Sequence, residues 1–265
     1  MLIDLHHLLL AVGLTLPRTA VVLAILPGFG AGTLGVMLRA AVAFGLSLPA
    51  MLPTYHFVRE HHAGVMLLTF LGIKEALVGL LLGLVMSVPM WALQSVGSIV
   101  DMQRSPILVQ SGNVSVDRDA STLGALMLQA MLVVMIQAGL LAALARVVLD
   151  SYAAWPVGSM TPPFGDVPQA ELVRHFSELM WHIVVYGAPM ILPLLLIDLG
   201  MAVIGAFAPN LQVSFAASPI KSLAGLFMLL VYWSTLSHYV GGDFARALDL
   251  IPSLLGDATG GGAGS

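Results

Sequence analysis

The sequence predicts an all-α, polytopic membrane protein with about six hydrophobic segments. Of its 265 residues, 58% are hydrophobic and 9% are charged, and the mean hydropathy is +0.97. Soluble domains carry about 25% charged residues, so an ordinary globular core does not fit this composition. Several apolar stretches are long enough for a helix to cross a bilayer. Prolines interrupt many of them, so we expect kinks or breaks within the helices.

The composition also excludes several classes of function. A formal net charge of -4 argues against a nucleic-acid partner, which needs a basic face. The absence of cysteine excludes disulfides, thiolate catalysis and Cys-based metal sites. The sequence has no Walker loop, G-x-S-x-G elbow or H-E-x-x-H motif. We therefore predict a chain that is not an enzyme and holds neither a cofactor nor a metal.

The first half of the chain contains three apolar segments. The first covers residues 5–26 and has no basic region typical of a signal peptide, so we expect it to be retained. The second covers residues 34–52 and is predicted to end at its prolines, with residues 55–62 as a polar connection. The third covers residues 65–100, with Pro89 expected to kink it.

Small and charged residues inside these segments favour helix packing. Gly79 and Gly83 form a small-xxx-small pair that permits two helices to approach closely. Arg18, Lys74 and Glu75 also lie within apolar segments. Such positions suit a chain that packs its helices against other proteins better than one that simply crosses lipid.

Polar residues 101–121 are predicted to form a loop before the fourth segment, residues 122–149. Ser121 can cap the start of that segment. At the end of the third segment, Asp101 and Arg104 are spaced i, i+3 and can pair. A helix end that reaches water and a loop that lines a passage both fit these residues.

The second half begins with a turn-rich stretch, residues 150–169. An amphipathic stretch then leads into the fifth segment, which ends near Phe207. The sixth covers residues 219–239, and a short amphipathic helix is expected over 243–255. We predict one helical membrane domain, residues 1–255, and a flexible glycine-rich tail, residues 256–265.

Two stretches resemble binding motifs, one for a dinucleotide and one for a metal, but their surroundings or spacing do not fit. Residues 30–35 match G-x-G-x-x-G, but residues 36–58 contain no carboxylate that would bind a ribose, so we interpret the match as a turn. Residues 56–62 contain three histidines whose spacing does not fit a helical zinc site. We interpret them as an interfacial loop.

The stretch 188–223 combines an apolar composition with Asp198, Asn210 and Lys221. An isolated Asp or Lys at mid-bilayer costs about 2.5–3.5 kcal/mol, so these groups are expected to face protein or water. Proline kinks or ends a helix. We therefore expect two helical arms around an Ala208-Pro209-Asn210 break, with Pro219 opening the second arm.

Three blocks in this order resemble the SctT/FliR family, the export-gate subunits of type III secretion systems and bacterial flagella. They are the run Gly97-Ser-Ile-Val-Asp-Met-Gln-Arg104, the Asp198 to Asn210 region, and Ser218-Pro-Ile-Lys-Ser-Leu223. The Pro-x-Lys of the last block is closer to the virulence branch. The resemblance implies a multi-pass protein of the bacterial inner membrane, within the basal body of a secretion system. It also implies that the hydrophobic segments form bent helical hairpins rather than straight spans.

The resemblance also implies partners and site residues. The partners are R-type and S-type gate subunits, the switch subunit of the export apparatus, and secreted proteins in transit. A pore plug is implied at residues 105–121, where the aliphatic run 107–109 lacks the aromatic residue of flagellar relatives. The implied pore and plug residues are Asp101, Gln103, Arg104, Ser105, Ile107, Leu108, Val109, Asn113, Asp117, Arg118 and Asp119. The expected structural and assembly residues are Asp198, Pro209, Asn210, Pro219 and Lys221.

The resulting hypothesis is a pore-forming subunit of an export gate for unfolded proteins. The alternative is a secondary transporter for an ion or small molecule, with Asp198 and Lys221 as its midplane site. A transporter should bind its solute as a purified single protein, whereas a gate subunit should co-purify with other membrane proteins.

Overall fold

The computed structural model describes residues 2–30, 34–61, 64–104, 121–160, 169–208 and 213–254. Those residues form seven helices and no strand. The helices are α1 (Leu2–Ile25), α2 (Val36–His61), α3 (Val65–Arg104), α5 (Thr122–Gln137), α6 (Leu140–Ala154), α7 (Gln169–Phe207) and α8 (Val213–Leu254). Five helices are long and apolar enough to cross a membrane, or up to six spans if the bent pair α5–α6 counts as one. The all-α, polytopic prediction is confirmed.

The helices divide into two compact units. The first comprises Met1–Val88, Met135–Leu172 and Phe244–Ser265, and the second comprises Pro89–Val134 and Val173–Asp243. Both α3 and α8 contribute to each unit. The single domain over residues 1–255 remains a prediction, and the tail at 256–265 lies outside the described residues.

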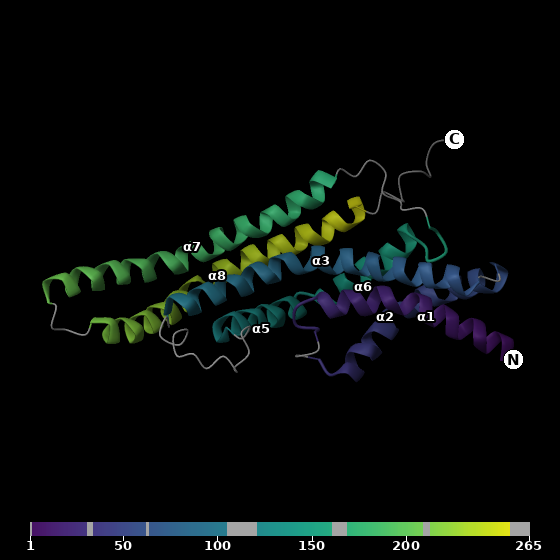
Figure 1. The fold of residues 1–265 in the computed structure, drawn as a ribbon, viewed down its shortest axis with the longest axis horizontal. Helices are drawn as coiled ribbons and strands as arrows, with labels where there is room; N and C mark the ends of the chain where they lie inside the picture. Colours follow the sequence, from purple (N-terminus) through teal and green to yellow (C-terminus); the bar gives the residue numbers. More distant parts are fainter. Residues whose placement is uncertain are drawn as a thin grey trace. The chain divides into compact units, whose positions relative to one another are not determined.

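In the first unit, α1 and α3 lie side by side (Figure 1). Gly79 of α3 lies against the backbone of Arg18, and Gly83 lies against Val22 so closely that a Cβ would be 3.3 Å from the Val22 Cα. The Ser87 hydroxyl also donates a hydrogen bond to the carbonyl oxygen of Ile25 at 3.3 Å. The predicted glycine pair therefore does provide a close helix contact.

Helix α2 continues through Pro49 and Pro53 to His61, so the prediction that these prolines end it was wrong, as was the polar connection at 55–62. Each proline removes one backbone donor, but the remaining polar groups of an apolar stretch can be satisfied only within a helix. The Thr54 hydroxyl, one residue after Pro53, is also satisfied within the helix, because it donates to the Ala50 carbonyl oxygen at 2.7 Å.

The predicted fourth segment is two helices rather than one. Helices α5 and α6 meet at an angle of 77°. Gly139, between them, has φ 95, in the left-handed region where glycine has no steric penalty. Its N–H donates to the carbonyl oxygen of Ile136 at 3.1 Å, which closes the end of α5.

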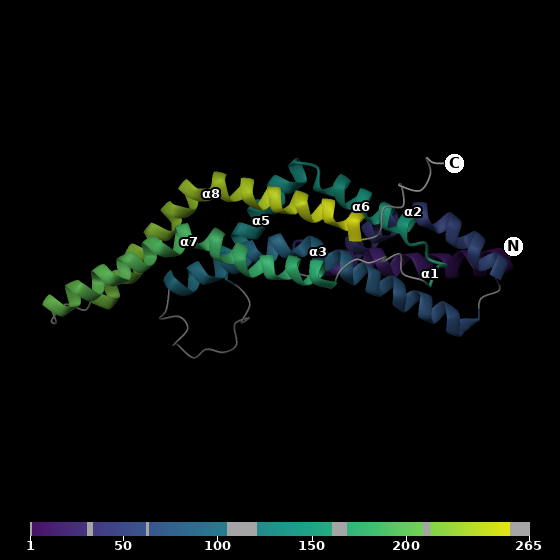
Figure 2. The ribbon, with the colours of Figure 1, turned by 90° about the horizontal axis from the view of Figure 1, so that it is seen from above.

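In the second unit, α7 and α8 form a long hairpin whose arms run side by side (Figures 1 and 2). Helix α7 ends at Phe207, as predicted, and residues 209–212, which include Pro209 and Asn210, lie outside the described residues. Helix α8 begins at Val213, so Pro219 lies inside it and does not open it. It also continues through Gly241 and Gly242, so the separate helix predicted at 243–255 is wrong.

Candidate functional site

The polar residues Asp101 to Arg104 form the last turn of α3. The predicted loop therefore cannot begin at Asp101. Arg104 donates from its Nη2 atom to Asp101 Oδ1 at 3.0 Å, so the i, i+3 pair forms within the helix. The pair neutralises the Asp101 charge and leaves its second oxygen available to another helix.

That second oxygen binds the start of α5. Asp101 Oδ2 accepts a hydrogen bond from the Ser121 hydroxyl at 2.7 Å and another from the Leu123 backbone N–H at 2.7 Å. The Ser121 hydroxyl oxygen in turn accepts from the Gly124 backbone N–H at 2.9 Å. The Ser121 cap is thus confirmed, and Asp101 adds a carboxylate at the positive end of the helix dipole. We call Asp101, Arg104, Ser121 and Leu123 the helix-end cluster.

Two glycines bring α3 and α5 together beside the helix-end cluster. A Cβ on Gly97 would lie 2.5 Å from the Gly124 Cα, and a Cβ on Gly124 would lie 2.8 Å from the Gln94 carbonyl oxygen. Real Cβ atoms do not approach so closely. Glycine is therefore needed at both positions for the Asp101 carboxylate to reach the first N–H groups of α5.

Lys221 of α8 joins three helices of the second unit. Its ammonium group forms an ion pair with Asp198 Oδ1 of α7 and donates to the Gln103 carbonyl oxygen at 3.0 Å. The carbonyl groups at the end of a helix lack partners within it, so a cation is favourable there. The Lys221 side chain is 7% exposed, whereas that of Asp198 is 41% exposed. We expected both members of this pair to be buried, but only Lys221 is buried and Asp198 is exposed.

The remaining predicted site residues are placed as follows. Pro219 lies on an exposed face of α8. Ten predicted residues lie outside the described residues: Ser105, Ile107, Leu108, Val109, Asn113, Asp117, Arg118, Asp119, Pro209 and Asn210. The structure brings Asp101, Arg104, Gln103, Lys221 and Asp198 into two adjoining sets of contacts at the end of α3.

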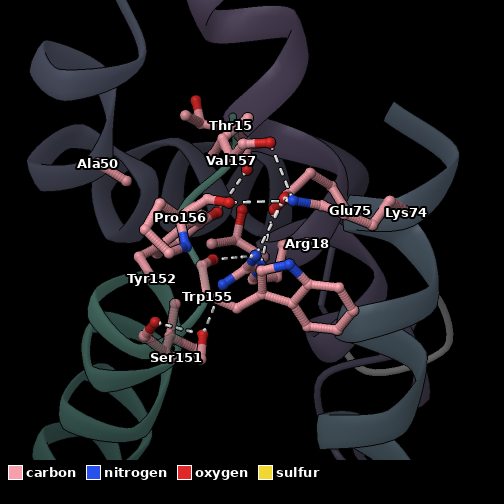
Figure 3. Close-up of polar contacts among 12 residues, drawn as sticks. Thr15, Arg18, Ala50, Lys74, Glu75, Ser151, Tyr152, Trp155, Pro156 and Val157 are labelled. Carbon is pink, nitrogen blue, oxygen red and sulfur yellow. Dashed lines mark hydrogen bonds and ion pairs between the residues drawn. The ribbon is translucent and has the colours of Figure 1, made fainter. Parts of the chain in front are cut away.

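A second polar cluster lies in the first unit, and sequence reasoning did not identify it as a site (Figure 3). Arg18 of α1 forms a bidentate ion pair with Glu75 of α3, with its Nε atom 2.7 Å from Oε2 and its Nη2 atom 3.0 Å from Oε1. Both side chains are fully buried. Arg18 also donates to the Ser151 hydroxyl at 3.1 Å and to the Trp155 carbonyl oxygen at 3.0 Å. The guanidinium thus ties α1, α3 and α6 together.

Lys74 completes this cluster on the side of the turn that follows α6 (Figure 3). Its ammonium group donates to the carbonyl oxygens of Pro156, Val157 and Ser159 at 3.1, 2.9 and 3.0 Å. The same nitrogen lies 2.8 Å from Glu75 Oε1. An ammonium group has only three N–H donors, so these contacts occupy all of them. Among the described residues, no buried side-chain nitrogen or oxygen of this cluster lacks a hydrogen-bond partner, and such an arrangement is that of a structural joint between helices.

The signal for this cluster was present in the sequence as Arg18, Lys74 and Glu75 inside apolar stretches. What was missing was their pairing, because 57 residues separate Arg18 from Glu75. We call Arg18, Lys74, Glu75 and Trp155 the buried charge cluster.

An apolar cavity of about 800 Å³ lies beside the buried charge cluster, between α2, α6 and the turn after α6. Among its lining residues, Gly158 lies so close to the Phe57 ring that a Cβ would be 2.6 Å from it. Among the described residues, no group of three or more His, Asp and Glu side chains could hold a metal ion. His62 of the histidine-rich stretch lies outside that description.

Comparison with known proteins places this chain among export proteins. Residues 9–247 match the family described as bacterial export proteins, family 1. The chain is 32% identical to the Yop proteins translocation protein T of Yersinia pestis, over 93% of this chain and 95% of that protein.

Two other relatives are more distant. The secretion system apparatus protein SsaT of Salmonella typhimurium is 25% identical over 88% of this chain and 90% of its own length. The flagellar biosynthetic protein FliR of Bacillus subtilis is 27% identical over 75% of this chain and 74% of its own length. The greater similarity to the translocation protein agrees with the resemblance to the virulence branch. The family match begins within α1 and ends within α8, so it covers the five helices between them in full, and this chain belongs to family 1 of the bacterial export proteins.

Proposed function

We propose that this chain is a structural, pore-forming subunit of a type III secretion export gate in the bacterial inner membrane. The observation that carries the proposal is the similarity to the Yop translocation protein over 93% of this chain and 95% of that relative. Five to six apolar helices of spanning length support a multi-pass inner-membrane location. The substrates are unfolded secreted proteins, and the chain acts without catalysing a reaction.

The geometry at the end of α3 supports a gating role for the segment that follows. Asp101 connects the last turn of α3 to the first turn of α5, and these are the helix ends that flank residues 105–120. Lys221 holds the same end of α3 to α8. We propose that residues 105–121 plug the pore and that the helix-end cluster fixes the base of the plug.

The proposed partners are R-type and S-type gate subunits and the switch subunit of the export apparatus. Much of the apolar surface of the α7–α8 hairpin is left uncovered by this chain itself. Only 11% of the apolar stretch within Met180–Phe207 is buried, and 22% of that within Ala217–Leu248. A hairpin with this much exposed apolar surface suits a subunit that completes its packing within a larger assembly.

The test is extraction in mild detergent of the tagged full chain, expressed together with its own operon, followed by mass spectrometry. We expect one large complex that contains other small hydrophobic export proteins. Recovery of the chain alone or as a homodimer would overturn the proposal. Solute transport through Asp198 and Lys221 would then become the better explanation, although the Lys221 ammonium already binds Asp198 and the Gln103 carbonyl oxygen.

A further inference from the structure

The two oxygens of the Asp198 carboxylate differ in their contacts within this chain. Lys221 contacts its Oδ1 atom, and among the described residues no other partner of this carboxylate is present. Lys221 itself is 7% exposed and has a second acceptor, the Gln103 carbonyl oxygen. Asp198 is 41% exposed. The cation of the pair is therefore enclosed, and the anion presents an oxygen outward from α7.

An outward carboxylate is costly on a face that meets lipid. An Asp at the centre of a spanning helix costs about 2.5–3.5 kcal/mol on insertion scales, although an ion pair reduces this cost. A carboxylate accepts several hydrogen bonds through its two oxygens, and acyl chains supply none. This position should therefore face a hydrogen-bond donor.

The side chains next to Asp198 indicate what kind of molecule supplies that donor. On a helix, residues at i−3 and i+4 lie on the same side as residue i. These positions are Leu195, which is 49% exposed, and Ala202, which is also exposed. We call Leu195, Asp198 and Ala202 the Asp198 face. It is an apolar surface with one acceptor, and the small Ala202 side chain allows another helix to approach closely.

The geometry points to the Asp198 face as the docking surface for a membrane helix of another subunit, whose contact surface is apolar except for one donor, a lysine or arginine. This inference rests on the proposed function, because it requires an assembly of membrane subunits. The carboxylate fixes how far the two helices are shifted along each other, since the donor must lie opposite Asp198. The flanking apolar residues supply most of the buried contact area.

Site-specific cross-linking tests which molecule covers this face. A photo-cross-linking amino acid in place of Leu195 should form an adduct with one other subunit of the recovered complex. The matched control is the same substitution at Leu196, which is 60% exposed but, at i−2, does not share the side of Asp198. We expect the adduct at position 195 and little at position 196. An adduct with a second copy of this chain, or none at 195, would overturn the inference.

Two substitutions test the contact itself. Ala202→Phe adds bulk to the Asp198 face, and Leu196→Phe adds it elsewhere on the same helix. Asp198→Asn keeps the shape and removes the charge. Loss of a hydrogen bond to a charged group weakens a binding constant by at least about tenfold, so we expect Asp198→Asn to lower complex recovery. The added ring of Ala202→Phe should lower recovery by keeping the partner helix away, whereas Leu196→Phe should leave recovery unchanged. Replacing the lysine or arginine of the cross-linked partner helix with methionine should cause the same loss of complex recovery as Asp198→Asn.

The controls separate this inference from the proposed function and from misfolding. Ala202 is exposed, so Ala202→Phe should leave the membrane abundance and protease resistance of this chain unchanged when it is expressed alone. If the wild-type chain assembles normally and Ala202→Phe does too, the docking surface is wrong and the gate function stands. If the wild-type chain itself forms no complex, the proposed function fails.

Discussion

Arg18 and Glu75 form a bidentate ion pair although both side chains are completely excluded from solvent. Two buried charges are tolerated when their geometry is good and further hydrogen bonds satisfy the remaining atoms. Here Ser151, the Trp155 carbonyl group and Lys74 supply those bonds. The pair therefore depends on helices α1, α3 and α6 all being in place.

Removal of one member of this pair should destabilise the protein strongly. We expect Arg18→Ala to lower the free energy of unfolding by about 3–5 kcal/mol, because the Glu75 charge is left buried without its partner. Membrane abundance and thermal unfolding in detergent measure the effect. Arg174→Ala is the control, because the Arg174–Glu178 pair is exposed and such pairs contribute about 0–1 kcal/mol.

The double variant Arg18→Met, Glu75→Leu separates loss of the charge pair from loss of packing. Replacing both charges with apolar residues of similar volume is often close to neutral in a buried site. We expect the double variant to be more stable than Arg18→Ala. A double variant at least as unstable as Arg18→Ala would contradict this account.

Glycine at position 97 should be required for the contact between α3 and α5. We expect Gly97→Val to lower stability by about 1–3 kcal/mol, because its Cβ cannot fit against Gly124. Gly72→Ala in the same helix is the control, since among the described residues its added Cβ would have no neighbour within 4 Å apart from the adjacent residues and the nearby backbone of its own helix. Alanine is the better helix former by up to about 1 kcal/mol, so Gly72→Ala should be neutral or stabilising. Equal unfolding temperatures for the two variants would contradict the contact.

Asp101 should protect the start of α5. We expect Asp101→Ala to cost about 1–2 kcal/mol locally, because the Leu123 N–H and the Ser121 hydroxyl both lose their acceptor. Hydrogen exchange of the Leu123 and Gly124 amides in the purified complex measures this loss. Thr69→Ala is the control on α3, because within the described part of the chain the Thr69 hydroxyl forms its hydrogen bond inside its own helix, to the Val65 carbonyl oxygen. Unchanged exchange in Asp101→Ala would show that the cap contributes nothing.

Lys221 should matter for assembly more than for the choice of secreted protein. Lys221→Ala removes the partner of Asp198 and the donor to the Gln103 carbonyl oxygen, which together should cost about 1–3 kcal/mol. We expect less complex from membranes, while the relative amounts of different secreted proteins stay the same. Normal complex recovery from membranes that carry this variant would refute the prediction.

The sequence predicted the fold class and most helix positions because apolar length alone identifies spanning helices. It misplaced the ends of α2 and α8 because Pro49, Pro53 and Pro219 were read as helix ends. In apolar surroundings a helix continues through proline, since no water is present to bind the freed backbone groups. The bend at Gly139 was also missed, because the apolar pattern is the same on both sides of it.

In the candidate site, contacts between residues close in sequence were predictable, whereas contacts between distant residues were not. The Asp101–Arg104 pair was predictable because both residues lie one turn apart on one helix. The Arg18–Glu75 pair and the Lys221 contact with Gln103 join residues 57 and 118 positions apart. Sequence spacing carries no information at that range. The charges inside apolar segments indicated that partners must exist but did not identify them.

The lengths of three helices have a consequence for where this protein lies. Helices α3, α7 and α8 contain 40, 39 and 42 residues. At 1.5 Å per residue each is about 60 Å long, about twice the thickness of the hydrocarbon core of a bilayer. Acyl chains can therefore surround only about half of each helix when it stands upright. The apolar stretches within these three helices contain 40, 28 and 32 residues, so each of them is also longer than the hydrocarbon core is thick. The apolar residues beyond the core would be exposed to water unless protein encloses them, so the membrane alone cannot cover the apolar surface of these helices.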